Sequence, residues 1–88
     1  MPGSSDDKLK SDLKRLIVEV CRKKIDPQSV PDDAPIIGRD SLLELDSLDV
    51  LELSAALKNN YNVRIMDSKD AFMKMKSINA LADTIQPE

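Results

Sequence analysis

Residues 46–59, DSLDVLELSAALKN, decide the fold that we expect for this chain. The stretch has no Gly or Pro, and its apolar residues recur at steps of three and four, which predicts an amphipathic helix. These residues form two neighbouring stripes: Leu48, Leu51 and Ala55 in one, and Val50, Leu53 and Leu57 in the other. Because apolar residues cover more than one edge of this helix, it needs other helices to pack against.

Three further helices are predicted from spacing and from helix-capping residues. Apolar residues recur at helical steps from Leu9 to Val20 and basic residues follow at 22–24, which predicts a first helix over residues 6–25 that ends before Asp26-Pro27. A short helix is expected over residues 67–76, opened by an Asp67 cap, and a last helix is expected to follow a Ser77 cap. The chain is therefore expected to be all-α, a small four-helix bundle of three longer helices and one short helix.

A long loop, residues 26–46, is expected between the first and second helices. It contains residues that interrupt the chain too often for a long helix or a central strand: Pro27, Pro31, Pro35 and Gly38. It also contains apolar residues that are expected to hold it against the core: Ile36, Ile37, Leu42, Leu43 and Leu45. Loops of this length in compact domains are often functional.

Length and composition limit the kind of protein that this sequence encodes. With 88 residues, 41% of them hydrophobic, the chain has room for one small core. Residues 1–5 are expected to form a flexible N-terminal tail and residues 6–88 a single domain. No basic-then-apolar leader and no apolar run of membrane-spanning length is visible, so we expect a cytoplasmic monomer that does not insert into membranes.

The sequence lacks the side chains of several common catalytic and metal sites. Cys21 is the only cysteine, and there is no histidine. These facts exclude an intrachain disulfide, a Cys/His nucleophile, a Ser-His-Asp arrangement and a Cys-His metal cluster. We therefore expect no catalytic residue and no metal site. If a serine of this chain is modified, another protein must activate it.

The negative charge is concentrated in the middle of the chain. Residues 26–57 contain eight acidic residues and a single basic one, Arg39. An acidic surface repels nucleic acid and attracts basic protein surfaces. The tripeptide Asp-Ser-Leu occurs twice in this region, around Ser41 and around Ser47.

The two serines are expected to have different roles. Ser41 and Glu44 fit a capping box, in which the serine hydroxyl is used by the backbone of a turn. At the second copy Asp46 is expected to be the cap, with Asp49 at the third helical position, so that Ser47 is the first helical residue. Its hydroxyl is then free and faces solvent. The positive end of the helix dipole would stabilise a phosphodiester attached there.

Residues 46–53, DSLDVLEL, resemble the phosphopantetheine attachment motif of acyl carrier proteins. The resemblance spans nearly the whole chain, because the order of the expected helices and the Pro-rich loop fits the same family. It implies that Ser47 carries a covalent 4′-phosphopantetheine, transferred from coenzyme A by a phosphopantetheinyl transferase. The arm would carry acyl groups as thioesters, so the protein is expected to be a carrier and not an enzyme.

The resemblance also implies roles for residues around the serine. Asp46 would help the transferase to position magnesium and substrate. The residues expected to meet acyl-transfer and ketosynthase-type enzymes with basic docking surfaces are Asp46, Leu48, Asp49 and Glu52. The candidates for lining an acyl cavity are Leu51, Ala55, Ile65, Phe72, Met73 and Met75, since Met adapts to a variable guest. For each of these six residues, a role as an ordinary core residue explains the sequence about as well.

The chain departs from the family pattern in two places. Lys58-Asn59-Asn60 stands where members of fatty-acid synthesis have a run of Glu, and Ile65-Met66 stands where they have Ile-Pro. Lys58 would weaken attraction to basic surfaces, so we expect a changed set of partner enzymes. The sequence is more similar to stand-alone accessory carriers of specialised acyl, polyene or lipid-modifying pathways.

Two alternatives to an acyl carrier remain. A peptidyl carrier of amino-acid ligation would usually show glycines before the serine, where this chain has Glu44-Leu45-Asp46. A non-carrier helical module that presents an acidic face would use Ser47 only as part of a helix end. Modification by a transferase with coenzyme A separates both carriers from this module.

Overall fold

The computed structural model describes residues 3–38, 41 and 43–86. Its α-helices are α1 (Asp7–Val20), α2 (Ser47–Tyr61), α3 (Ser68–Lys74) and α4 (Ile78–Ile85), and its 3-10 turns are η1 (Gly3–Ser5) and η2 (Pro27–Ser29). The described part of the chain has no β-strand, only an isolated bridge between Ile37 and Leu45. The predicted all-α fold with four helices and a long loop after the first is confirmed, although α4, with eight residues, is nearly as short as α3.

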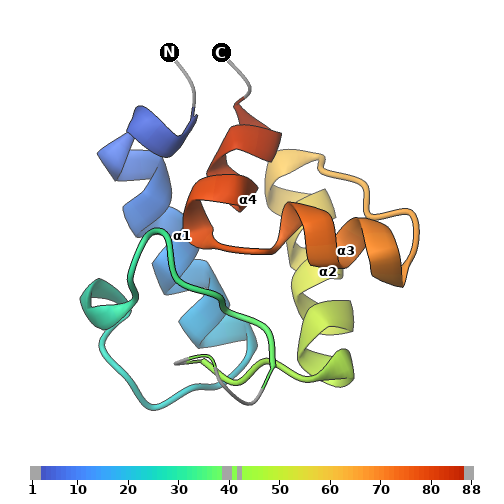
Figure 1. Ribbon diagram of the computed structural model, residues 1–88, viewed down its shortest axis with the longest axis horizontal. Coiled ribbons are helices and arrows are strands. Elements are labelled where there is room, and N and C mark those ends of the chain that lie inside the picture. The colour runs from blue at the N-terminus through green and yellow to red at the C-terminus, as the bar shows by residue number, and fades with distance from the viewer. Residues whose placement is uncertain (1–2, 39–40, 42, 87–88) are drawn as a thin grey trace.

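The helices enclose a core of aliphatic side chains. In Figure 1, α4 lies between α1 and α2, and α4 contacts both α1 and α3. The core takes buried side chains from all four helices and from the long loop, among them Leu13, Ile17, Leu53, Leu57, Met75, Ile78 and Leu81. Apolar burial of this kind is the main stabilising contribution in a small domain.

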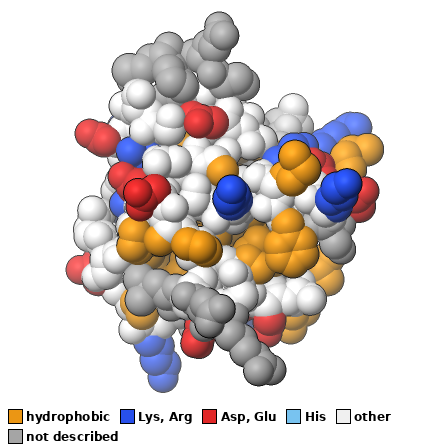
Figure 2. Space-filling view, viewed as in Figure 1, with side chains coloured by type: hydrophobic (Ala, Val, Ile, Leu, Met, Phe, Trp, Pro, Cys, Tyr) orange, Lys and Arg blue, Asp and Glu red, His pale blue; other side chains and the backbone are white. Residues whose placement is uncertain are grey.

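The two apolar stripes of α2 have different surroundings. Leu53 and Leu57 of the second stripe are fully buried, whereas Leu48 and Leu51 of the first stripe remain 63% and 68% exposed. Figure 2 shows further hydrophobic side chains at the surface beside α3, where Phe72 is among the exposed residues. Exposed apolar groups that gather on one face often mark a binding surface.

The first helix ends at the last residue of its apolar pattern, Val20, and not just before Asp26-Pro27 as predicted. It begins with Asp6 as the N-cap, whose Oδ1 accepts a hydrogen bond from the Leu9 amide at 3.1 Å. It ends at Val20, because Arg22 has a left-handed backbone (φ 55°) and the Lys23 amide donates to the carbonyl oxygen of Val18 at 3.0 Å. This bond pattern closes the last helical turn.

The long loop is held against the core, as expected. Val30, Ile36, Leu43 and Leu45 are buried and Ile37 is half-buried, while the predicted anchor Leu42 lies outside the described residues. The Leu45 amide donates to the carbonyl oxygen of Ile36 at 3.2 Å, and the Gly38 amide donates to that of Leu45 at 3.0 Å. Two segments of the loop therefore run side by side and deliver the chain to the start of α2.

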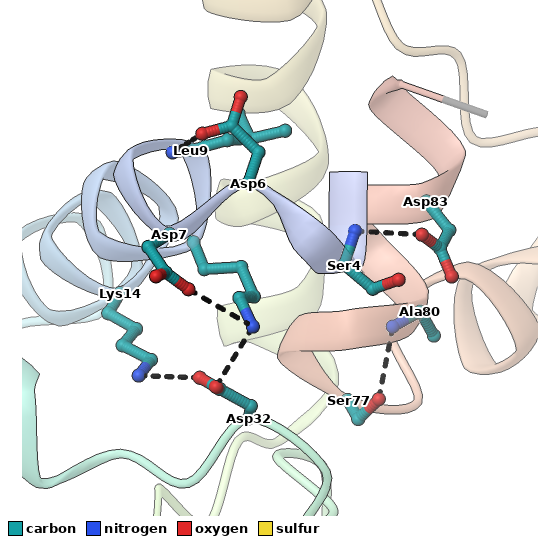
Figure 3. A network of polar contacts seen from close by, with 10 residues as sticks. Ser4, Asp6, Asp7, Leu9, Lys14, Asp32, Ser77, Ala80 and Asp83 are labelled. Carbon is teal, nitrogen blue, oxygen red and sulfur yellow. Dashed lines mark hydrogen bonds and ion pairs between the residues drawn. The ribbon is translucent and has the colours of Figure 1, made fainter. Parts of the chain in front are cut away.

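An ion cluster joins the loop to α1 (Figure 3). Asp32 Oδ2 lies 3.0 Å from Lys10 Nζ, and Asp32 Oδ1 lies 2.6 Å from Lys14 Nζ. The hydrogen bond from Lys14 is the main reason that the pKa of Asp32 lies below its ordinary value. The backbone amide of Asn79 in α4 donates to the Asp32 carbonyl oxygen at 2.9 Å. Asp32 therefore connects three separate parts of the chain.

Residues 3–5 of the expected N-terminal tail make defined contacts. These residues form η1, which packs on α4: the Gly3 amide donates to the Gln86 carbonyl oxygen at 2.6 Å, and the Ser4 amide donates to Asp83 Oδ1 at 2.8 Å (Figure 3). Gly3 is needed at this place because a Cβ there would collide with the carbonyl group of Ala82. Gly3 and Ser4 are therefore packed closely against α4. Residues 1–2 of the expected tail lie outside the described residues.

Candidate functional site

Ser47 is the first residue of α2, directly after the N-cap Asp46. Asp46 Oδ1 accepts a hydrogen bond from the Asp49 amide at 2.9 Å, and the Asp46 amide donates to Asp49 Oδ2 at 3.2 Å. The predicted cap at Asp46, with Asp49 at the third position, is confirmed as a reciprocal capping box. Ser47 is exposed, and among the described residues nothing hydrogen-bonds to its hydroxyl.

Ser41 is in the opposite situation. It is only 7% exposed, and its hydroxyl donates to the Gly38 carbonyl oxygen at 2.6 Å while accepting from the Glu44 amide at 2.9 Å. The prediction that a local turn uses this hydroxyl is confirmed. The predicted capping box is not formed, because the Ser41 amide donates to the Gly38 carbonyl oxygen at 3.2 Å and not to the Glu44 carboxylate. The contact comes from the backbone of Glu44, whose left-handed conformation (φ 48°) closes the turn, and the Glu44 side chain is exposed.

A groove of about 590 Å³ begins at Ser47 and runs between α2, the long loop and α3. Four residues of α2 line it, Ser47, Val50, Leu51 and Ser54. The opposite wall comes from the loop and from the segment that ends in α3, and includes Ile37, Leu45, Ile65, Met66, Ala71 and Phe72. A volume of this size is typical of sites for small molecules, which are mostly apolar with a few polar groups.

The structure brings half of the predicted cavity residues together. Leu51, Ile65 and Phe72 line the groove. Ala55 lies outside this groove, in an adjoining hollow. Met73 is 67% exposed, and Met75 is fully buried in the core, so neither lines the groove.

The positions in α3 explain why two of the methionines do not reach the groove. Successive residues of a helix point in directions about 100° apart, so Met73 faces away from the side on which Phe72 lies. Met75 is the C-cap of α3 and packs inward. The groove residues that sequence reasoning missed on α2 are Val50 and Ser54. Their spacing of three and seven residues from Ser47 was a usable signal, since such residues share one helix face.

Three of the four predicted partner-contact residues are exposed and one is not. Leu48 and Glu52 are exposed, as is Asp46. The Asp49 side chain is only 16% exposed, because it completes the capping box and lies 3.2 Å from Lys23 Nζ in an ion pair. Asp49 is therefore held by the protein's own groups and presents little carboxylate surface.

Cys21 lies behind this part of α2. Its Sγ is 3.8 Å from the Asp49 carbonyl oxygen, a weak hydrogen bond, and the residue is buried. Burial, with a smaller contribution from the negative charge of Asp49, raises the pKa of the Cys21 thiol to about 11. The thiol is therefore neutral near pH 7 and serves as a small core residue.

Within residues 3–38, 41 and 43–86 no three Cys, Asp or Glu side chains gather in a way that would hold a metal ion. In those same ranges, none of the helices has the length and the apolar character that crossing a membrane requires.

Comparison with known protein families matches residues 11–85 to the family described as "Phosphopantetheine attachment site". The match covers most of the chain and all of α2, so the chain belongs to this family of phosphopantetheine-binding carriers, as expected for a member of the acyl carrier protein family. Among curated proteins, none matches the chain.

Membership in this family defines the cofactor and the coarse role. The domain takes a covalent 4′-phosphopantetheine, and its role is to carry acyl or peptidyl groups. Carrier domains of this kind are not themselves catalytic, and they interact with phosphopantetheinyl transferases and with partner enzymes.

The residues at the start of α2 fit such a group. The Ser47 hydroxyl is exposed and unbonded within the described residues, and it stands at the positive end of a helix of 15 residues, where a phosphodiester is electrostatically favoured. The groove that starts beside it offers apolar surface for whatever the group carries. When bound, the group supplies a thiol that holds an acyl or peptidyl group as a thioester.

Proposed function

We propose that this protein is an acyl carrier whose 4′-phosphopantetheine is attached to Ser47. The observation that carries the proposal is the contrast between the two Asp-Ser-Leu copies. The Ser41 hydroxyl is buried and engaged in two hydrogen bonds, whereas the Ser47 hydroxyl is exposed at a helix start and at the mouth of a groove. A transferase needs a serine that it can reach.

The groove supports an acyl rather than a peptidyl cargo. Its walls on both sides consist mainly of apolar side chains, including Leu51, Ile65 and Phe72. A hydrocarbon chain gains free energy by leaving water for such a surface, at about 25 cal/mol for each Å² buried. We therefore propose fatty-acid-like, polyketide, polyene or lipid-modifying biosynthesis as the setting, in the cytoplasm.

The exposed residues beside Ser47 suggest how partners dock. Leu48 offers an apolar contact, and Asp46 and Glu52 offer carboxylates near it. A basic surface on the transferase, or on acyl-transfer and ketosynthase-type enzymes, would be attracted by these charges and would pack on Leu48. Asp49 contributes mainly by holding the start of α2, since its carboxylate is used by Lys23 and by the Asp46 amide. We propose that the carrier works as a monomer.

Mass spectrometry of the intact protein tests this proposal. After incubation with coenzyme A, magnesium and a broad-specificity phosphopantetheinyl transferase, we expect a gain of one phosphopantetheine, located on Ser47 by fragmentation. Ser47→Ala is expected to abolish the gain and to keep the helical circular-dichroism spectrum. Ser41→Ala is the matched control and is expected to be modified as the wild type is.

Two results would contradict the proposal. Modification that persists in Ser47→Ala would move the attachment site elsewhere. A folded wild-type protein that no transferase modifies would leave a helical module with an acidic face, in which Ser47 is only part of a helix start.

A further inference from the structure

A second hollow lies beside the groove, further along α2. Ser54, Ile65 and Met66 line both spaces, so the two adjoin. The second hollow, of about 510 Å³, is also lined by Ala55 and Lys58 of α2. The lining residues of α2 therefore follow one helix face away from Ser47 at steps of three and four residues.

Two cationic side chains stand at the far end of this path. Lys58 and Arg64 both line the second hollow, and both residues are exposed. Within the described residues neither side chain forms an ion pair or a hydrogen bond. The carbonyl oxygen of Arg64 accepts a hydrogen bond from Lys74 Nζ at 2.9 Å, which fixes the backbone of this segment and leaves the guanidinium free.

The lining changes from apolar to positively charged along α2. A purely hydrocarbon cargo would have no use for the two positive charges. The first part is walled by Val50, Leu51, Ile65 and Phe72, and the second part places two positive charges beside the same Ile65 and Met66. Arg and Lys bind carboxylates through charge-assisted hydrogen bonds, and two cations next to one hollow favour an anionic group between them.

The length of the path matches a cargo held on Ser47. Ser47 and Lys58 are both in α2, eleven residues apart, so about 16 Å separates them along the helix axis. Phosphopantetheine has thirteen bonds from phosphorus to sulfur, and an extended chain advances about 3.3–3.6 Å for every three bonds, so its span is about 15 Å. A short acyl group on the thiol is then within reach of Lys58 and Arg64.

We infer that the cargo is an acyl group with a carboxylate at its far end, of the dicarboxylic-acid type, and that Lys58 and Arg64 bind this carboxylate. The inference rests on the proposed function, because it requires an arm on Ser47. It makes Lys58 and Arg64 specificity residues of the carrier.

Two cargoes of equal chain length test the inference. The protein is loaded by a phosphopantetheinyl transferase with arms that bear a succinyl or a butanoyl group, each joined through an amide that does not hydrolyse. Intact mass first shows that loading is complete. Two-dimensional ¹H–¹⁵N spectra then report the backbone amides of Lys58 and Arg64, and thermal unfolding reports stability.

We expect the succinyl arm to shift these two amides at least twofold more than the butanoyl arm. We also expect a melting temperature about 1–4 °C higher with succinyl, which is the effect of an exposed ion pair in a domain of this size, and a smaller difference at high salt. In the double variant Lys58→Gln, Arg64→Gln both differences should disappear. The matched control Arg15→Gln, Lys24→Gln removes two positive charges at other exposed residues. In this control both differences between the cargoes should remain.

The possible failures are distinct. A protein that gains no mass contradicts the proposed function itself, and the inference fails with it. Complete loading with equal shifts from the two cargoes, or with a difference that survives in the Lys58→Gln, Arg64→Gln variant, overturns the inference and leaves the carrier function in place.

Discussion

Replacing Asp49 by Ala is expected to destabilise the fold, whereas replacing its exposed neighbour Glu52 by Ala is expected to change stability little. Asp49→Ala removes the bond from the Asp46 amide to Asp49 Oδ2 (3.2 Å) and the ion pair with Lys23 (3.2 Å). Loss of a helix-capping interaction costs about 0.5–2 kcal/mol. The ion pair, with side chains 26% and 16% exposed, adds about 0.5–1 kcal/mol.

The expected total for Asp49→Ala is about 1–2 kcal/mol, because the two losses share one carboxylate and do not add fully. For a domain of this size that corresponds to a fall in melting temperature of roughly 5–15 °C. For Glu52→Ala we expect a change within about 0.5 kcal/mol, as is usual for exposed residues without partners. Urea and thermal unfolding followed by circular dichroism measure both.

Lys23→Gln separates the two parts of the Asp49 effect, since it removes the ion pair and keeps the capping box. A double-mutant cycle of Lys23→Gln and Asp49→Ala should show a coupling energy of about 0.5–1 kcal/mol. An Asp49→Ala protein as stable as the wild type, or a Glu52→Ala protein equally destabilised, would refute the reasoning that Asp49 serves the fold.

Three other predictions follow from the polar contacts of the fold. Ser41→Ala should lower the free energy of unfolding by about 1–3 kcal/mol, measured in urea, because it leaves the Glu44 amide without its partner. The folded pKa of Asp32 is lowered by Lys14, so its stabilisation is present above the unfolded pKa and is lost as the pH falls through the lower folded value. The stability difference between wild type and Asp32→Asn, measured by urea unfolding, should therefore be largest near neutral pH and should narrow below about pH 4. Cys21, with a pKa of about 11, should react with iodoacetamide at pH 8 much more slowly in the folded protein than in urea, and a fast reaction in the folded state would contradict its burial.

The helix starts were predictable because each is encoded by neighbouring residues. The side chains of Asp46, Asp67 and Ser77 each accept a hydrogen bond from an amide three residues further on, as their sequences predicted. The assignment of Ser41 to a local turn has the same basis. A capping side chain and the amide that it binds are close in sequence, so a few neighbouring residues are enough to predict the start of a helix.

The helix end and the N-terminal packing were not predictable, because they depend on features without a strong sequence signal. Arg22 adopts a left-handed backbone that Gly or Asn would normally indicate, so the sequence gives no sign that α1 ends at Val20 and does not continue to Asp26-Pro27. The contacts of Gly3 and Ser4 with α4 join opposite ends of the chain. A short polar stretch gives no sign of such distant partners.

The groove was predictable on α2 and less so on the other wall. Residues of a regular helix share a face at known steps, which places Leu51 with Ser47 and extends to Lys58. The other wall is built from an irregular segment and a short helix, where side-chain direction changes between adjacent residues. Phe72 therefore faces the groove while Met73 and Met75 do not.

The acidic residues of α2 have different roles, some in folding and some in binding, and their contacts in the structure distinguish these roles. By sequence, Asp49 and Glu52 are equivalent carboxylates on one helix. In the structure the Asp49 carboxylate is 3.2 Å from Lys23 Nζ, and the charge of one is balanced by the other. An approaching basic surface is therefore attracted mainly by the carboxylates that remain exposed, Asp46 and Glu52, on the two sides of Leu48. Removing Glu52 should reduce the rate of arm transfer at low salt more than removing Asp49 does, even though Asp49 contributes more to stability.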